Sequence, residues 1–277
     1  MISARRALTI AGSDPSGGAG IQADLKTFAA FGVYGTSAIT AVTAQNTTGV
    51  TMTAPLSADL VTAQIEAVAG DIALHATKIG MLATAAIVEA VAAAIDELDL
   101  PNIVLDPVLM SSSGEPLLDA DGVQALMLTL LPRARVLTPN VPEAEVLSGC
   151  RITSAEDRQR AAHRLHDMGA TAVLITGGHA NDGQDDVIDL LFDGTSFVEL
   201  RVPRVGAHST RGTHGTGCAF ASALAARLAL GDAVADAAGR AQQYVAGGIA
   251  HAVAVGHGAH VIDHFWRERH LDRPRDL

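Results

Sequence analysis

Residues 211–225 read RGTHGTGCAFASALA, a turn punctuated by glycines and then a run of small apolar residues. This pattern predicts a glycine loop that leads into the N-terminus of a helix. The first N–H groups of such a helix have no partner within it, and with the helix dipole they favour a bound anion such as phosphate. Gly212, Gly215 and Gly217 would allow the backbone to approach closely and to take positive φ. Cys218 falls in the predicted first turn, where we expect the local field to lower the thiol pKa.

The same stretch is also compatible with a core helix that is entered through a glycine-rich turn. In that case Cys218 is an ordinary buried small residue. Short glycine motifs occur by chance in many proteins. Residues 211–225 alone leave both interpretations open, and the rest of the chain has to distinguish them.

The composition sets limits on the class of protein. Of the 277 residues 48% are hydrophobic and only 18% charged, so a large aliphatic core is expected in one or two domains. The net charge of −11 argues against a nucleic-acid surface, which needs a basic face. The two cysteines form no disulfide framework, which favours a reducing, cytoplasmic setting. We expect no signal peptide and no membrane-spanning helix, since the apolar runs are too short.

Apolar strand patterns alternate with amphipathic helix patterns along the whole chain. Such an order predicts parallel βαβ units with helices on both faces of a sheet, and no linker interrupts it. We therefore expect one α/β domain over residues 1–277. The predicted strands are 7–11, 35–44, 50–53, 76–79, 102–105, 135–137 and 172–175, and a hairpin joins 187–192 to 196–202 through Asp193-Gly194. The predicted helices are 21–31, 57–69, 84–98, 121–131, 141–147, 154–168, the helix that starts near 218, and 233–254.

Polar residues follow most of the predicted strands. In open α/β sheets, ligands bind beyond the carboxyl ends of the strands. We therefore expect the site to be built from the segments 12–14, 45–46, 80–81, 106–108, 138–140 and 176–178.

Seven segments carry a resemblance to a known family. They are AGSDPSGGAGIQADLKT (11–27), TAQNT (43–47), KIGML (78–82), LDPV (105–108), TPNVPEAE (138–145), GGH (177–179) and THGTGC (213–218). Together and in this order, from about residue 7 to 264, the chain resembles the hydroxymethylpyrimidine/phosphomethylpyrimidine kinases of thiamine biosynthesis, which are ribokinase-like. The resemblance implies a three-layer sandwich around a mostly parallel sheet. It also implies a homodimer that uses ATP and Mg²⁺ to phosphorylate a hydroxymethylpyrimidine and then its monophosphate.

The resemblance implies a set of substrate-binding residues. Asp24 and Gln45 match the positions that hydrogen-bond the aminopyrimidine ring. Gly12 and Val108 would supply backbone contacts, and Met81 an apolar wall. A carboxylate and an amide suit a ring that carries an exocyclic amine and ring nitrogens. The alternative for Asp24 is a solvent-facing position near the start of a helix.

Cys218 takes the place at which most ribokinase-like enzymes carry an aspartate base. By resemblance it would accept the proton of the substrate hydroxymethyl group, while the amides of Gly215, Thr216 and Gly217 hold the transferred phosphoryl group. The second acceptor is already an ionised phosphate monoester. The second step is therefore expected to depend less on a base.

The nucleotide and metal sites follow from the same resemblance. Asn140 and Glu143 form the N-x-x-E pattern that arranges Mg²⁺ through its waters near the phosphates, and Asp106 is a second candidate for this role. Without the resemblance, these residues would indicate only a turn and a helix start. The expected nucleotide-binding residues are Asn140, Thr176, Gly178, Thr213 and His214, the last of which would orient phosphate.

Two positions depart from the family pattern. Thr176 stands where many members have a lysine that reaches the ATP phosphates, and His257 replaces a lysine that is common in the C-terminal glycine motif. The chain therefore lacks positive charge on its nucleotide side. Arg211 and Lys78 are the residues that we consider as compensation.

Other functions remain open from the sequence. The nearest is a pyridoxal or pyridoxine kinase, which also acts on a hydroxymethylated aromatic nitrogen ring. The pyrimidine-type motifs and Gln45 disfavour it. A pyrimidine sensor that has lost catalytic power is favoured only by Thr176. A sugar kinase is disfavoured because Cys218 occupies the usual aspartate position.

Overall fold

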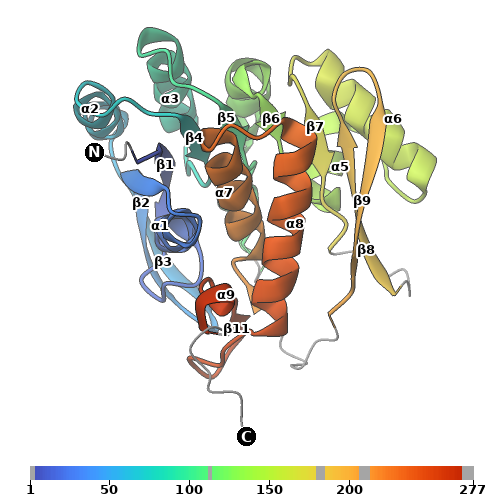
Figure 1. The fold of residues 1–277 in the computed structure, drawn as a ribbon. Coiled ribbons are helices and arrows are strands. Elements are labelled where there is room, and N and C mark those ends of the chain that lie inside the picture. Colours follow the sequence, from blue (N-terminus) through green and yellow to red (C-terminus); the bar gives the residue numbers. More distant parts are fainter. Residues whose placement is uncertain (1–3, 112–113, 179–184, 206–212, 270–277) are drawn as a thin grey trace, which may run out of the picture.

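A large mixed β-sheet forms the centre of the molecule (Figure 1). The structure is a computed structural model, and it describes residues 4–111, 114–178, 185–205 and 213–269. In spatial order the strands of this sheet are β3 (Gly49–Pro55), β2 (Tyr34–Asn46), β1 (Arg6–Ser13), β4 (Ala76–Ile79), β5 (Ile103–Leu105), β6 (Val136–Leu137), β7 (Val173–Ile175), β8 (Asp186–Phe192) and β9 (Phe197–Pro203).

Six neighbouring strands run parallel to one another, namely β2, β1, β4, β5, β6 and β7. At one end β3 pairs antiparallel with β2, and at the other β8 and β9 add an antiparallel hairpin. Parallel neighbours need a crossover connection, usually a helix, whereas antiparallel neighbours can be joined by a tight turn. The alternation of strands and helices in the sequence, and the Asp193-Gly194 turn, thus correctly predicted a mostly parallel sheet and the β8–β9 hairpin.

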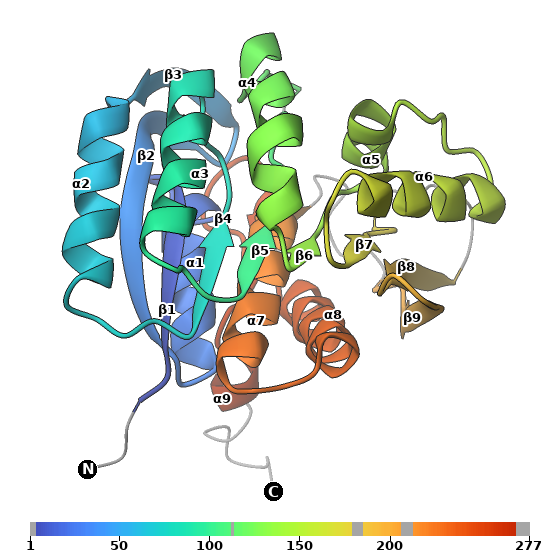
Figure 2. The same ribbon diagram turned by 90° about the horizontal axis from the view of Figure 1, so that it is seen from above.

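Helices cover both faces of the sheet, so that the fold has three layers (Figure 2). One face packs against α2 (Ala58–Ala69), α3 (Ala85–Glu97), α4 (Ala120–Ala125), α5 (Val141–Ser148) and α6 (Ala155–Asp167). The other face packs against α1 (Gly20–Ala30), α7 (Thr216–Ala229) and α8 (Val234–Ala250), and α9 (Trp266–Arg269) follows near the described end. The predicted α/β sandwich with helices on both faces is therefore confirmed.

Side chains on successive positions of β1 enter opposite cores, as the period of a strand requires. Leu8 and Ile10 belong to the core beneath α2 and α3, whereas Ala7 belongs to the core beneath α7 and α8. Thr9 points to the α7 side as well, where it meets Asp24 of α1. The Thr9 hydroxyl and the Asp24 carboxylate therefore lie inside this second core, close to the carboxyl ends of the strands.

Three local features differ from the sequence-based expectation. The helix predicted over 121–131 is α4 followed by a π-helical turn, Leu126–Leu130, and a 3-10 turn, Leu131–Arg133. The last long helix ends at Ala250 rather than near residue 254. A short parallel pair, β10 (Thr213–His214) with β11 (His260–Val261), was not predicted, since two-residue strands leave no periodic pattern.

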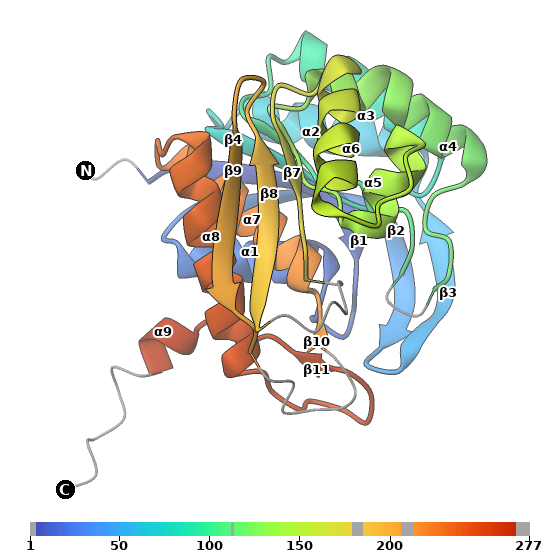
Figure 3. The same ribbon diagram turned by 90° about the vertical axis from the view of Figure 1, so that its right-hand side faces the viewer.

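The β2–β3 arm and the β10–β11 pair lie at the same end of the molecule (Figure 3). Hydrogen bonds join them: Thr47, in the β2–β3 turn, accepts from the backbone of Gly258 at its hydroxyl and of Ala259 at its carbonyl. The C-terminal glycine motif that includes His257 is therefore attached to the arm that carries Gln45.

No helix in the described ranges is long and apolar enough to span a membrane.

Candidate active site

A cavity of about 460 Å³ opens at the carboxyl ends of the parallel strands, where the sequence placed the site. Its wall is built from the ends of β1, β2, β4, β5, β6 and β7 and from the start of α7. Of the predicted site residues it includes Gly12, Gln45, Met81, Asp106, Val108, Asn140, Glu143, Thr176, Thr213, His214, Gly215, Thr216, Gly217 and Cys218.

Asp24 and Gly178 do not line the cavity. Gly178 is exposed beyond β7. Asp24 is fully buried, and its carboxylate accepts hydrogen bonds of 2.6 Å from the hydroxyls of Thr9 and Ser222. It also forms a 3.1 Å ion pair with Lys78. The burial of Asp24 excludes the solvent-facing alternative. In this structure Asp24 is engaged beneath the cavity, and its contact with the substrate ring stays a prediction.

Lys78 is a buried cation in the floor of the cavity. Its side chain is fully buried, and its Nζ lies 3.1 Å from Asp24 Oδ2 and 3.7 Å from Asp106 Oδ2. Burial alone would lower the pKa of Lys78, but the two carboxylates and the neighbouring Cys218 outweigh it and raise the pKa. Lys78 therefore stays charged and balances the carboxylates beneath the site. Sequence reasoning considered it only as a substitute for the missing lysine at Thr176.

The start of α7 faces the same cavity. Gly215 caps the helix with φ of 81°, and no described side chain caps the first turn. A Cβ at Gly215 would lie 1.8 Å from the carbonyl oxygen of Gly18, so only glycine allows the loop and the helix start to approach this closely. Anion binding by the N–H groups of Thr216 and Gly217 at this helix start stays a prediction.

Cys218 lies in the first turn of α7, but its thiol does not behave as that position suggested. Burial raises its pKa to about 12, and Asp106 and Asp24 add to the effect. The positive charge of Lys78 opposes this shift without overcoming it. The expectation of a lowered thiol pKa is therefore wrong, because desolvation and two nearby carboxylates outweigh the field at the helix start.

Asp106 and Glu143 place two carboxyl groups in the cavity wall. Burial raises the pKa of Asp106 to about 6 against the influence of Lys78. Burial, and next the charge of Asp106, raise the pKa of Glu143 to about 8. Asp106 Oδ2 is buried without a hydrogen-bond partner among the described residues. A nearby positive charge would stabilise the ionised form of both carboxyl groups.

Asn140 and Glu143 also form the helix start that the sequence indicated. The Asn140 side chain accepts from Glu143 N at 2.9 Å, and the Glu143 carboxylate accepts from Asn140 N at 3.0 Å. This capping box begins α5 and fixes both side chains in place. The N-x-x-E pattern can therefore serve both as a helix start and as part of a Mg²⁺ site, since the cap holds Glu143 at the wall of the cavity.

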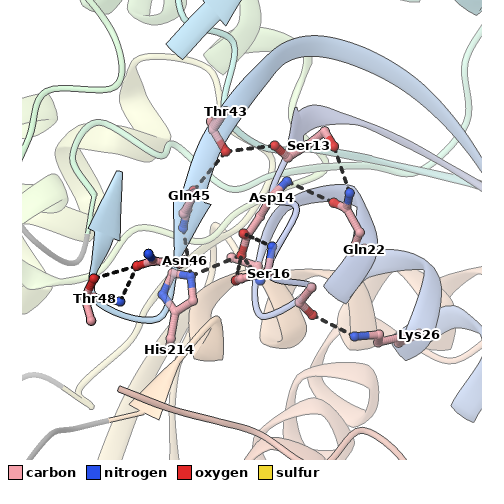
Figure 4. A network of polar contacts seen from close by, with 12 residues as sticks. Ser13, Asp14, Ser16, Gln22, Lys26, Thr43, Gln45, Asn46, Thr48 and His214 are labelled. Atoms are coloured by element: carbon pink, nitrogen blue, oxygen red, sulfur yellow. Dashed lines mark hydrogen bonds and ion pairs between the residues drawn. The ribbon is translucent and has the colours of Figure 1, made fainter. Parts of the chain in front are cut away.

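A polar network connects the glycine loop after β1 with the β2–β3 arm (Figure 4). His214 Nε2 lies 3.1 Å from Gln45 Nε2 and 3.3 Å from Asp14 Oδ2. Thr43 Oγ1 lies 3.2 Å from Gln45 Oε1 and donates to the carbonyl of Ser13 at 3.0 Å. Sequence reasoning missed Asp14 and Thr43 as site residues, although Asp14 stood among the polar residues that follow β1.

Asp14 is ionised throughout the neutral range. Burial would raise its pKa, but hydrogen bonds from His214, from the Ser16 hydroxyl and from the N–H groups of Ser16 and Ala19 outweigh burial and lower the pKa to about 2. The carboxylate is therefore an acceptor only. It holds together the loop between β1 and α1.

Comparison with known proteins identifies the family. The family model described as phosphomethylpyrimidine kinase matches residues 14–263. The chain belongs to the phosphomethylpyrimidine kinase family. It is 46% identical over 260 residues to the hydroxymethylpyrimidine/phosphomethylpyrimidine kinase of Bacillus subtilis, with 94% of each chain covered. The resemblance inferred from the seven motifs is thereby confirmed, and the protein is a kinase.

Solved structures of related kinases share the fold. A phosphomethylpyrimidine kinase from Clostridium difficile matches with a TM-score of 0.77 and 39% identity, covering 87% of this chain and 97% of that one. The pyridoxal kinase from Staphylococcus aureus in complex with AMP-PCP and pyridoxal matches with a TM-score of 0.87 and 36% identity, covering 96% of each chain. AMP-PCP is an ATP analogue, so this relative supports ATP as the co-substrate of the kinase.

Thr176 lines the cavity at the end of β7, on the side away from the polar network. Lys78, on β4, lies three strands away, which corresponds to about 14 Å at the usual spacing of strands. Its Nζ is already engaged by Asp24 and Asp106. Lys78 therefore does not replace a lysine at position 176. Arg211, the other residue that we considered, and His179 of the GGH motif lie outside the described residues.

Proposed function

We propose that this kinase transfers the γ-phosphoryl group of ATP to 4-amino-5-hydroxymethyl-2-methylpyrimidine and then phosphorylates the monophosphate to the diphosphate. The observation that carries the proposal is the shared cavity, which Gln45, Met81 and Val108 line together with the start of α7. This wall offers an amide and apolar contacts to a small ring, beside N–H groups suited to a phosphoryl group. The volume is in the range of small-molecule sites.

The direct test is a time course of the protein with Mg²⁺-ATP and the hydroxymethylpyrimidine, with the mono- and diphosphate products resolved by chromatography. We expect the monophosphate first and the diphosphate after it. Formation of the monophosphate alone would restrict the proposal to the first step. A pyrimidine that raises Tm without forming product would indicate a sensor instead.

We assign Mg²⁺ to the wall formed by Asp106 and Glu143, with Glu143 acting through water. The chemistry of these residues fits the ion, because carboxylate oxygens are its usual ligands and Asp106 Oδ2 lacks a hydrogen-bond partner in the described structure. When bound, Mg²⁺ would neutralise negative charge on the ATP phosphates. Among the described residues no group of three or more His, Cys, Asp or Glu is arranged to hold a metal, so substrate phosphates and water would complete the coordination.

Binding of Mg²⁺ should release protons at neutral pH. Glu143, with a pKa of about 8, is mostly protonated at pH 7 without the ion. A nearby divalent cation favours the carboxylate, so we expect release of nearly one proton and an affinity that falls as the pH falls from about 8 to 6. Titration calorimetry with Mg²⁺ in two buffers of different ionisation enthalpy measures this release. Glu143→Gln should abolish it, and heats that do not depend on the buffer would contradict the assignment.

Thr176→Lys should strengthen nucleotide binding. A lysine at the end of β7 would add a cation at the position that carries one in many family members, and a charge-assisted hydrogen bond to phosphate corresponds to about a tenfold decrease in the KM for ATP. Thr176→Met is the matched control, since it adds length without charge. If both variants change the KM for ATP equally, charge at this position is not what limits nucleotide binding.

Pyridoxine is the second candidate substrate. The match to the Staphylococcus aureus pyridoxal kinase favours it, since that protein shares the fold over 96% of the chain. We propose that any activity on pyridoxine is a side activity, because the Bacillus subtilis relative, 46% identical, carries the pyrimidine kinase name.

We further propose that residues 1–277 form a single kinase domain, and that the kinase is a cytoplasmic homodimer, as the family resemblance implies.

A further inference from the structure

His214 is held at the edge of the cavity by backbone and packing contacts. It lies on β10, which pairs with β11, so its Cα position is fixed by the opposite end of the chain. Its ring packs against Gly18, where an added Cβ would lie 2.8 Å from His214 Cδ2. From this position Nε2 faces two groups at once, the Asp14 carboxylate and the Gln45 amide (Figure 4).

The Asp14 carboxylate determines which atom of the histidine carries hydrogen. Asp14 accepts from Ser16 N at 2.8 Å, from Ser16 Oγ at 2.9 Å and from Ala19 N at 2.8 Å. A carboxylate in this role offers only acceptor sites. Its 3.3 Å contact with His214 is favourable only if Nε2 carries a hydrogen.

A hydrogen on Nε2 in turn determines the orientation of Gln45. A nitrogen that carries hydrogen attracts an acceptor, so the amide atom 3.1 Å away must be the oxygen of Gln45 rather than its nitrogen. The two ends of an amide have the same shape, and their assignment follows from the hydrogen bonds they make. The side-chain oxygen of Gln45 therefore faces His214.

The other end of the amide gives the same result independently. Thr43 has one hydroxyl hydrogen, which it donates to the carbonyl of Ser13. Its oxygen can then only accept from Gln45, 3.2 Å away, and this requires the amide nitrogen at that end. With this orientation each contact along Asp14, His214, Gln45, Thr43 and Ser13 joins a donor to an acceptor, and Asp14 and Gln45 share the single hydrogen on His214 Nε2.

We propose that His214 is a positioning residue for the substrate ring, which fixes the Gln45 amide with its oxygen toward His214 and its nitrogen toward Thr43. One N–H and one oxygen lone pair of Gln45 then remain for a ligand. They match a ring nitrogen and its neighbouring exocyclic amine, as found in a 4-aminopyrimidine. The inference rests on the proposed pyrimidine substrate, and it replaces the expectation that His214 orients phosphate.

The test compares ring affinity with nucleotide affinity in His214→Phe. Titration calorimetry would measure the Kd of 4-amino-5-hydroxymethyl-2-methylpyrimidine without nucleotide, and separately the Kd of Mg²⁺-ADP. We expect the Kd of the pyrimidine to rise about tenfold and that of ADP to change less than about twofold. A rise confined to ADP would overturn the inference and restore the phosphate role.

A double-mutant cycle separates positioning from a general disturbance of the site. In a Gln45→Leu background His214→Phe should have almost no further effect on the Kd of the pyrimidine, since no amide remains to be oriented. Thr43→Val, which keeps the shape of the side chain, should show the same dependence on Gln45 from the other end of the amide. If the loss of pyrimidine affinity in His214→Phe or Thr43→Val adds fully to the loss in Gln45→Leu, the proposal is contradicted. This holds even where a variant is less stably folded.

The Kd of the pyrimidine for the wild-type kinase distinguishes a failure of the proposed function from a failure of this inference alone. A wild-type kinase that binds no pyrimidine overturns the proposed function, and this inference with it. A wild-type kinase that binds the pyrimidine, with variants that leave its Kd unchanged, overturns the inference alone.

Discussion

Cys218→Ala should lower kcat for the first phosphorylation by about 100-fold or more, and for the second by less than about tenfold. The first acceptor is a hydroxymethyl group, whose proton has to leave as the new O–P bond forms. The second acceptor is a phosphate monoester that is largely ionised near neutral pH. Loss of the side chain that lies in the cavity at the start of α7 should therefore affect mainly the first step.

The pH dependence of the first step follows from the raised pKa of Cys218. With a thiol pKa of about 12, the thiolate that can accept a proton is scarce at neutral pH and increases with pH. We expect the first-step rate to rise by up to about tenfold per pH unit between roughly pH 7 and 9, and the second-step rate to rise less. In Cys218→Ala this difference between the steps should disappear.

Cys150→Ala is the matched control for this experiment. Cys150 does not line the cavity; its thiol contacts the carbonyl of Ser148 and the guanidinium of Arg164. Its replacement should leave both steps unchanged. Equal losses in the two steps for Cys218→Ala would contradict the base role and would indicate that Cys218 supports the loop structurally.

Lys78→Met should destabilise the protein by about 3–5 kcal/mol. The substitution leaves Asp24 as a buried carboxylate whose remaining partners are the hydroxyls of Thr9 and Ser222. It also removes the cation nearest to Asp106. Breaking a buried ion pair by removing one partner leaves an uncompensated charge, which costs far more than the loss of a surface pair. Urea denaturation followed by circular dichroism measures the change in the free energy of unfolding.

Lys26→Met provides the control for the Lys78 experiment. Lys26 lies on the same helix as Asp24, but it is exposed and donates only to the carbonyl of Gly17 among the described residues. We expect its replacement to change the free energy of unfolding by less than about 0.5 kcal/mol. Adding Asp24→Asn to Lys78→Met should recover part of the lost stability, because it removes the stranded charge. No recovery would show that packing of the lysine stem, rather than charge, stabilises this region.

The sequence was sufficient to predict the layers of the fold and the location of the site. The alternation of strands and helices implied a parallel sheet, and the carboxyl ends of such strands meet at one edge. Residues that follow β1, β5, β6 and β7 were therefore expected to form one cavity, as they do. The same rule placed Gln45 and Met81 in this cavity, and the family motifs suggested their roles toward the substrate ring.

The direction in which Asp24 points could not be read from its position in the chain. A carboxylate near the start of a helix can face a ligand, solvent or the core, and the decision lies with Lys78 and Ser222, which are distant in sequence. The thiol pKa of Cys218 was mispredicted for a similar reason. Its place in α7 was evident, but the burial that mainly raises its pKa and the carboxylates of Asp106 and Asp24 that add to the effect depend on other elements of the fold.

The specificity constant kcat/KM, measured for the hydroxymethylpyrimidine and for pyridoxine on one preparation, tests the central claim most directly. An assay of ADP formation at saturating Mg²⁺-ATP serves both substrates. The account predicts a value for the pyrimidine at least about tenfold higher, because the Gln45 amide matches the paired donor and acceptor of an aminopyrimidine. A higher value for pyridoxine would contradict the account and would identify the protein as a pyridoxine kinase.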